Sequence, residues 1–412
     1  MSTISAEQIV SSSPPASIGV RGRQRRRLGV ATRRQLLRFS VSDFDDADFE
    51  HLSVSPTSAL LRPGAKTTEF ETVFAKFVGV KHAIAVNSFA AAMHLSFHAI
   101  GIHEDDEVIT SPYTFSGVTS AVQQLRATAT FVDVDTATLN IAPEQITAAI
   151  TDKTRAIAPA HAGGLPSDMN AILSIAREHR IPVIESAAQT FPARESGRMI
   201  GQHGNVVCFS FHSESPIDTG QGGMICVNDD ALAQQCRRLL LGRNCDDESI
   251  ATWFDETQTP SCFSPMPELN AIAGLAQLKN AEQHWQRRRE IAVTYNAIFS
   301  SLTELECPHD RPECQHAWHM YPLRLNQRHL IIDREQFIEE LRQRNIEATV
   351  RFVPIHLHPD YRGLYGDNPE RYPVAVREFE REVSLPIYSK MDDQDVKDVV
   401  DAVMDVVSRF RC

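Results

Sequence analysis

The residues of this chain with the clearest capacity for chemistry lie together in one short polar segment. His212, Glu214 and Ser215 follow an apolar run that begins at Val206, and a glycine-rich turn follows them. An imidazole beside a carboxylate is enough for general acid–base work on a carbonyl compound, so His212 and Glu214 are candidate catalytic residues. Ser215 with His212 as a nucleophilic pair is a weaker interpretation, because no Gly-x-Ser-x-Gly turn surrounds this serine.

An open α/β sheet is expected to position these residues. From about residue 68 the chain alternates helical hydrophobic patterns with short apolar segments that are typical of strands. The seven predicted strands are residues 82–86, 107–110, 129–134, 156–160, 182–185, 206–211 and 224–227, with helices at about 68–78, 90–100, 143–150, 168–180 and 230–241. Strands joined by helical crossovers form a mainly parallel sheet, whose site lies at the carboxyl ends of the strands.

Composition narrows the class of protein. The chain has 412 residues and a net charge of -12, which argues against general nucleic-acid binding and fits a cytoplasmic protein. Its eight cysteines show no CxxC and no zinc-type spacing, so reduced thiols are expected and a metal site is not. No segment predicts a membrane span or a secretory signal.

Residues 1–45 are predicted to form a basic, disordered N-terminal tail. The run from Arg21 to Arg27 is compatible with an anionic partner, but a solvated leader is the favoured interpretation.

The segment from Cys208 to Met224 resembles the signature of the DegT/StrS family, the sugar aminotransferases of fold type I that use pyridoxal phosphate (PLP). Ser210, Phe211 and His212 match its Ser-Phe-His, and the three glycines at 220, 222 and 223 match its Gly-x-Gly-Gly. Looser matches run from about residue 50 to the end of the chain. The resemblance implies a large domain over residues 46–285 and a smaller C-terminal α/β domain over 286–412, linked by a helix at about 269–300. In the smaller domain, strands are expected at 320–325 and 349–352, around a helix at 333–344, with a last helix from about 393.

The residues that would hold PLP in this family are altered here. The family's Schiff-base lysine position is Ser215, and a serine cannot form an imine. Ser186 stands where an aspartate would hold the pyridinium, and Phe89 replaces a glycine of the phosphate cradle. Phe89 is expected to fill the phosphate site, the alternative being that it turns into the core. Residues 263–266 also lack the asparagine and arginine that the family contributes from the neighbouring subunit, which itself implies a homodimer.

Other family contacts are kept, so a pocket is expected to remain. Ser210 would retain a phosphate contact, and His161 is a further candidate catalytic residue, although it belongs to the general family pattern. The residues expected to bind substrate are Tyr113, Phe89, Gln189, Ser186, Asp218, His319 and His356. Each of the histidines could equally be a hydrogen-bonded structural residue.

Three functions follow as alternatives. The first is a PLP-independent protein of a sugar or secondary-metabolite pathway that uses the vacated pocket for acid–base chemistry on a keto or amino metabolite, such as a nucleotide sugar. The second is a non-catalytic pseudo-aminotransferase that pairs with an active homologue or pathway partner. The third is an enzyme that holds PLP or pyridoxamine phosphate (PMP) non-covalently. No cofactor is expected in the first two cases.

Overall fold

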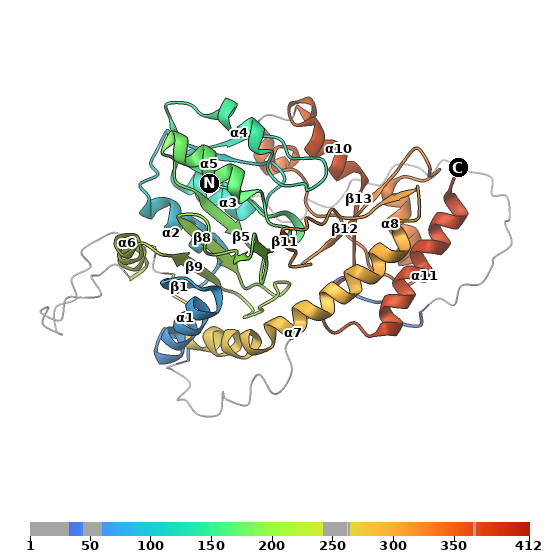
Figure 1. Cartoon of the computed structure of the whole chain (residues 1–412), viewed down its shortest axis with the longest axis horizontal. Helices are drawn as coiled ribbons and strands as arrows, with labels where there is room; N and C mark the ends of the chain where they lie inside the picture. Colours follow the sequence, from blue (N-terminus) through green and yellow to red (C-terminus); the bar gives the residue numbers. More distant parts are fainter. Residues whose placement is uncertain (1–32, 44–59, 242–261, 263, 366–367) are drawn as a thin grey trace, which may run out of the picture. The chain divides into compact units, whose positions relative to one another are not determined.

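The computed structural model describes residues 33–43, 60–241, 262, 264–365 and 368–412 (Figure 1). In the larger part of the chain its helices and strands are α1 (Ala65–Val78), β1 (His82–Val86), α2 (Phe89–Ala99), β2 (Glu107–Thr110), α3 (Ser116–Gln124), β3 (Thr128–Phe131), α4 (Pro143–Ala149), β4 (Thr154–Ile157), α5 (Met169–His179), β5 (Ile184–Ala187), β6 (Arg194–Glu195), β7 (Arg198–Met199), β8 (Val206–Ser210), β9 (Gly223–Val227) and α6 (Asp230–Leu241). The C-terminal part contains α7 (Glu268–Phe299), β10 (Leu305–Glu306), β11 (Cys314–Gln315), β12 (Tyr321–Leu325), α8 (Arg334–Arg342), α9 (Pro359–Tyr365), α10 (Pro373–Arg381), β13 (Glu382–Leu385) and α11 (Asp393–Phe410).

Seven strands build the central sheet. Four are ordered β1-β9-β8-β5 and three are ordered β3-β2-β4. Parallel bridges from Ile157 to Val183 and from Ala160 to Ser186 join the two groups between β4 and β5. β9 is antiparallel to both of its neighbours, whereas the other paired strands are parallel. The predicted mainly parallel, seven-stranded α/β sheet is confirmed.

Both faces of this sheet are buried, which explains the near-continuous apolar runs in its strands. All five residues of β8 and of β9 are buried. Alternate residues point to opposite faces: Cys208 packs into the core that includes α2 and α6, and Val207 and Phe209 pack into the core that includes α1 and the first half of α7. The helices on both faces therefore hold the carboxyl ends of the strands in place.

The C-terminal part has its own three-stranded antiparallel sheet, ordered β10-β12-β13. Helix α7 connects the two cores, since Ala281 packs in the core of the large sheet and Tyr295 in that of the small one. Figure 1 shows α7 running from α1 to the neighbourhood of α11. The expected strand at 349–352 was wrong: only Thr349 forms a bridge, to Ser384, and β13 takes the place beside β12.

Residues 33–43 lie within the interval predicted as a disordered tail, yet they pack on the C-terminal part. Leu37 is only 4% exposed, and its backbone exchanges hydrogen bonds with Asn345 and Glu347. Arg33 forms ion pairs of 2.6 and 2.8 Å with Asp395 and Asp398 on α11. The prediction is thus corrected for this segment, because it finds partners far away in the sequence. The rest of the predicted tail, including the basic run, lies outside the described residues.

Candidate functional site

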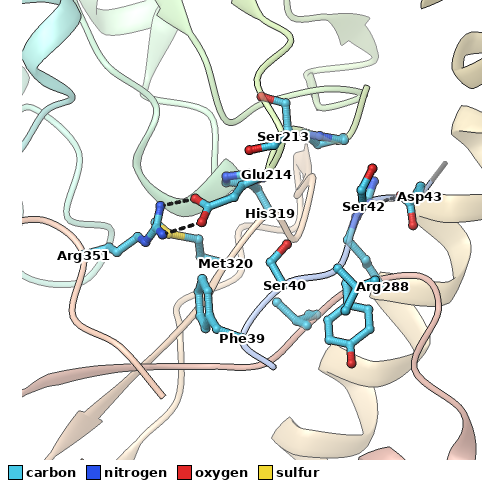
Figure 2. A pocket seen from close by; sticks show the side chains of 15 residues that line it. Phe39, Ser40, Ser42, Asp43, Ser213, Glu214, Arg288, His319, Met320 and Arg351 are labelled. Carbon is cyan, nitrogen blue, oxygen red and sulfur yellow. Dashed lines mark hydrogen bonds and ion pairs between the residues drawn. The ribbon is translucent and has the colours of Figure 1, made fainter. Parts of the chain in front are cut away.

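The polar loop after β8 holds His212 and Glu214, but their side chains do not pair. The backbone N–H of Glu214 donates to His212 Nδ1 at 3.0 Å. The Glu214 carboxylate instead meets the Arg351 guanidinium twice, at 2.5 Å and 2.8 Å (Figure 2). Burial lowers the pKa of His212, with smaller opposing effects from Glu214 and Asp218. His212 is therefore a neutral imidazole near pH 7, and Glu214 is neutralised by a residue that the sequence analysis did not single out.

Ser215 lines a cavity at the end of this loop. It is 7% exposed, and its Oγ has no hydrogen-bond partner in the described part of the chain. The cavity encloses about 490 Å³, counted out to bulk solvent, and one of its walls is the N-terminal segment from Phe39 to Asp43. His319 and Met320 line the same cavity.

Burial also governs the ionisation of His319. It lowers the pKa of His319 well below its usual value, and the neighbouring His212, Arg288 and Arg351 act in the same direction. His319 therefore presents a neutral imidazole to the cavity.

A second cavity, of about 340 Å³, contains positions that the resemblance assigns to the PLP ring, and we call it the ring cavity. It is lined by four of the predicted site residues, Tyr113, His161, Ser186 and Gln189, and by Met320, which it shares with the first cavity. The Tyr113 hydroxyl donates to the backbone oxygen of Arg351 at 3.0 Å, and Gln189 Oε1 accepts from the Gly163 N–H at 2.9 Å. These two side chains are thus already oriented by the protein.

His161 is held on both sides of its ring. Its Nδ1 accepts from the Ser167 N–H at 3.0 Å, and its Nε2 lies 3.2 Å from Glu185 Oε2. With Nδ1 as an acceptor, the ring proton is on Nε2 and points at the Glu185 carboxylate. This geometry is that of a structural histidine, which the sequence analysis weighed equally.

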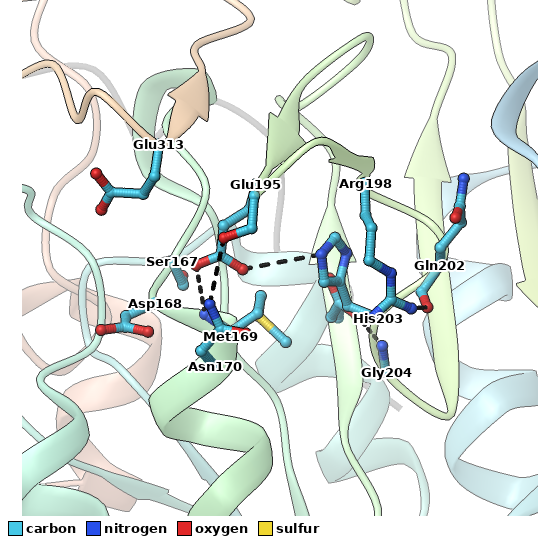
Figure 3. A network of polar contacts seen from close by, with 12 residues as sticks. Ser167, Asp168, Met169, Asn170, Glu195, Arg198, Gln202, His203, Gly204 and Glu313 are labelled. Atoms are coloured by element: carbon cyan, nitrogen blue, oxygen red, sulfur yellow. Dashed lines mark hydrogen bonds and ion pairs between the residues drawn. The ribbon is translucent and has the colours of Figure 1, made fainter.

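The turn that carries Ser167 rests on a further polar network (Figure 3). Glu195 Oε1 accepts from the Met169 N–H at 3.1 Å, and its other oxygen lies 3.8 Å from His203 Nε2. Burial raises the pKa of Glu195 and lowers that of His203. The network fixes the start of α5 and, through Ser167, the position of His161.

The two residues that the resemblance assigns to the phosphate site, Ser210 and Phe89, are both buried. Ser210 is 5% exposed, and its Oγ has no partner among the described residues. Phe89 begins α2 and is 4% exposed; its ring lies 5.9 Å from that of Phe115 in an edge-on arrangement. A side chain at Gly117 would meet the same ring at 2.8 Å, so Phe89 packs into the core on α3.

Two other predicted binding residues, Asp218 and His356, lie outside the two cavities. Asp218 accepts hydrogen bonds from Ser42 Oγ at 2.5 Å and from the Gly220 N–H at 2.6 Å. His356 is 1% exposed, edge-on to Tyr372 at 4.9 Å, and burial lowers its pKa. Asp218 and His356 line neither of the two cavities described above, and the same holds for His212 and Phe89.

Sequence reasoning missed two arginines of the first cavity, Arg288 and Arg351. Arg288 lies on α7 and is 4% exposed. The helical spacing of Arg288 indicated that it is buried, because it falls on the same face of the helix as the apolar residues Trp285, Ile291 and Tyr295, which are also buried. Arg351 lies in an irregular segment without such a pattern.

Comparison with known proteins agrees with this architecture. A profile of the DegT/DnrJ/EryC1/StrS aminotransferase family matches residues 44–404. The chain belongs to this family. It is 38% identical to the spore coat polysaccharide biosynthesis protein SpsC of Bacillus subtilis, over 92% of this chain and 99% of SpsC. It is 42% identical to the uncharacterised protein MJ1066 of Methanocaldococcus jannaschii, over 84% of this chain and 92% of that protein.

Solved structures show the same fold, which confirms the fold-type-I aminotransferase prediction. The aminotransferase TlmJ from Streptoalloteichus hindustanus superimposes with a TM-score of 0.83 at 28% identity, covering 91% of this chain and 99% of TlmJ. Helicobacter pylori PseC, an aminotransferase involved in the biosynthesis of pseudoaminic acid, gives a TM-score of 0.84 at 23% identity, with coverage of 91% and 100%. Among the described helices, none has the length and apolar character needed to cross a bilayer.

Proposed function

We propose that this protein is a lysine-free member of its family that acts on a keto or amino metabolite of a sugar biosynthetic pathway without covalently held PLP. The observation that carries the proposal is Ser215, which lies buried in the cavity wall; the resemblance of its segment to the family signature aligns it with the family's lysine. A hydroxyl there cannot form an imine. Membership of the family and the similarity to SpsC support a role in polysaccharide or other sugar biosynthesis.

The ring cavity also lacks the residue type that PLP chemistry requires. Ser186 lines this cavity, and a neutral hydroxyl cannot keep a pyridine nitrogen protonated. Tyr113 and Gln189 still line the cavity, so a planar or ring-shaped group has room there. The residues present therefore do not fit a covalently held, ring-protonated PLP, and no step of the proposed reaction passes through it.

Two neutral imidazoles supply the proton-transfer capacity in this proposal. Because the Glu214 N–H occupies His212 Nδ1, the proton of His212 is on Nε2, from which it can donate to a substrate carbonyl. His319 lines the first cavity and, being neutral, can accept a proton from the carbon next to that carbonyl; His212 directly precedes Ser213, Glu214 and Ser215 of the same lining. Ser215 completes the same wall as a hydrogen-bond donor. The proposed reaction class is an acid–base isomerisation or elimination.

One observation favours a second function, that of a non-catalytic partner of an active homologue. The Glu214 carboxylate is neutralised by Arg351, and His161 is held by Ser167 and Glu185, so neither is free to transfer protons. In that case a His319→Ala variant should support the pathway as well as the wild type. The acid–base proposal requires that the same variant abolish turnover while the protein stays folded.

The first experiment is an absorbance titration of purified protein with PLP and PMP, with Ser215→Lys and Ser215→Ala variants alongside. We expect no saturable binding by the wild type or by Ser215→Ala at millimolar cofactor. The Ser215→Lys variant reports whether an amine at this position restores an imine band, which controls for access to the cavity. Saturable binding of either cofactor by the wild type would refute the proposal and favour non-covalent use of PLP or PMP.

A further inference from the structure

The cavity beside Ser215 contains a buried cation whose hydrogen-bonding edge is open. Arg288 lines this cavity and is 4% exposed, and its Nε and Nη2 have no hydrogen-bond partner in the described part of the chain. Its nearest charge is Asp43, whose Oδ2 lies 3.7 Å from Nη1, beyond hydrogen-bonding distance. A guanidinium removed from water without hydrogen bonds is costly, so this edge calls for an acceptor.

Asp43 does not belong to Arg288 alone. Its carboxylate also accepts a hydrogen bond from Ser389 Oγ and lies 3.4 Å from His284 Nδ1. Burial lowers the pKa of Arg288, and Asp43 offsets this only in part. The charge of Arg288 is therefore only partly compensated by the protein.

The other cation of the cavity is in the opposite situation. Arg351 is bound twice by Glu214 and has the Phe39 ring 5.3 Å from its guanidinium carbon. Figure 2 shows this pair on one side of the cavity, and Arg288 with Ser42 and Asp43 on the other. A ligand that enters therefore meets a neutralised Arg351 and an open Arg288.

The two open nitrogens of Arg288 define the chemistry of the ligand. Nε–H and Nη2–H lie side by side in one plane and can donate to the two oxygens of one carboxylate. The unpartnered Oγ of Ser215 adds a third donor in the same cavity. With Asp43 close by, a single negative charge suits the cavity better than the double charge of a phosphate.

We propose that this cavity binds the carboxylate of an acidic sugar, with Arg288 as the bidentate donor. The inference rests on the proposed function in one respect, namely that the substrate is sugar-derived. It extends that function by assigning the substrate class: a sugar acid, with its carboxylate on Arg288 and the rest of the molecule towards the ring cavity, which adjoins at Met320.

Calorimetric titration of the full chain with glucuronate, glucose and glucose 6-phosphate tests this assignment. We expect glucuronate to bind in the millimolar range or tighter, at least about tenfold more tightly than either of the other two. An Arg288→Lys variant keeps the charge but loses the planar fork, so glucuronate binding should weaken at least about tenfold. The matched control is Arg289→Lys, because Arg289 is the exposed neighbour on the same helix and should leave binding unchanged.

Equal binding of glucuronate and glucose, no saturation with glucuronate, or tighter binding of glucose 6-phosphate would each overturn the assignment. So would an Arg288→Lys variant with wild-type affinity. The ligand preference is measured on the wild type, so the test stands even where the variant fails to fold. Titration of the same wild-type sample with PLP separates the two proposals: PLP binding refutes the proposed function, whereas glucuronate selectivity decides the role of Arg288.

Discussion

The packing of residues 33–43 can be tested at Leu37, because the chain provides its own control in Leu36. Leu37 is 4% exposed within the core of the C-terminal part, and Leu36 is 48% exposed. Truncating a buried leucine to alanine typically costs about 2–5 kcal/mol, the range depending on how far the site collapses. A short segment held by an isolated bridge can relax, so we expect about 2 kcal/mol for Leu37→Ala and less than about 0.5 kcal/mol for Leu36→Ala.

The assay is urea unfolding combined with amide hydrogen exchange. The N–H of Leu37 donates to Asn345 O at 2.8 Å, and the N–H of Glu347 donates to Leu37 O at 3.0 Å, so both amides report directly on this contact. Leu37→Ala should speed exchange at both amides by at least about tenfold, since a 1.4 kcal/mol loss of local stability corresponds to a factor of ten. Leu36→Ala should leave both unchanged.

The same substitution has a consequence for the cavity, because residues 39–43 form one of its walls. Releasing the segment should weaken glucuronate binding together with the loss of protection at Glu347. Equal effects of Leu36→Ala and Leu37→Ala on stability and exchange would refute the packing of this segment. Loss of protection with unchanged ligand affinity would show that the wall makes no contribution to binding.

Two further predictions concern ionisation and charge. Burial lowers the pKa of His316 from 6.5 to about 3, so the unfolded state takes up a proton at this residue first as the pH falls. The free energy of unfolding should therefore decrease as the pH drops from 6.5 towards 3. In the His316→Asn variant this part of the pH dependence should disappear, as measured by urea unfolding at several pH values. The side chains of the Glu214–Arg351 pair are partly exposed, at 35% for Glu214 and 25% for Arg351. A double-mutant cycle with Glu214→Gln and Arg351→Gln should therefore give a coupling energy of only about 0.5–1 kcal/mol. A coupling energy near zero would contradict the formation of this pair in solution.

The central sheet could be predicted from the sequence because its strands are buried on both faces. The apolar run from Val206 to Ser210 indicates by its own composition that the strand is buried. The local sequence around Leu37 gives no such indication, because Leu37 is buried by a contact with Ile346, far along the chain. Basic residues around Leu37 give a local composition typical of a solvated tail. Local pattern therefore predicts the core of the central sheet, but not the N-terminal segment that packs on the C-terminal part.

The candidate site was predictable to a similar degree. The positions of Tyr113, Ser186 and Gln189 followed from the family pattern, and the structure brings them to one cavity. Whether the side chains of His212 and Glu214 pair could not be predicted from the sequence, because a loop has no fixed periodicity. The partner of the Glu214 carboxylate is Arg351, which lies more than a hundred residues later in the chain.

The distribution of satisfied and unsatisfied donors indicates how a ligand is oriented across the two cavities. In the ring cavity, the Tyr113 hydroxyl already donates to the Arg351 backbone oxygen, and Gln189 Nε2 donates to Met320 Sδ. In the adjoining cavity, Arg288 and Ser215 are buried without partners among the described residues. An open buried donor gains most from a ligand, whereas an engaged donor must first give up a bond. We therefore expect the charged group of the substrate beside Arg288 and its less polar ring beside Tyr113, so that substitutions at Arg288 should affect affinity more than those at Gln189.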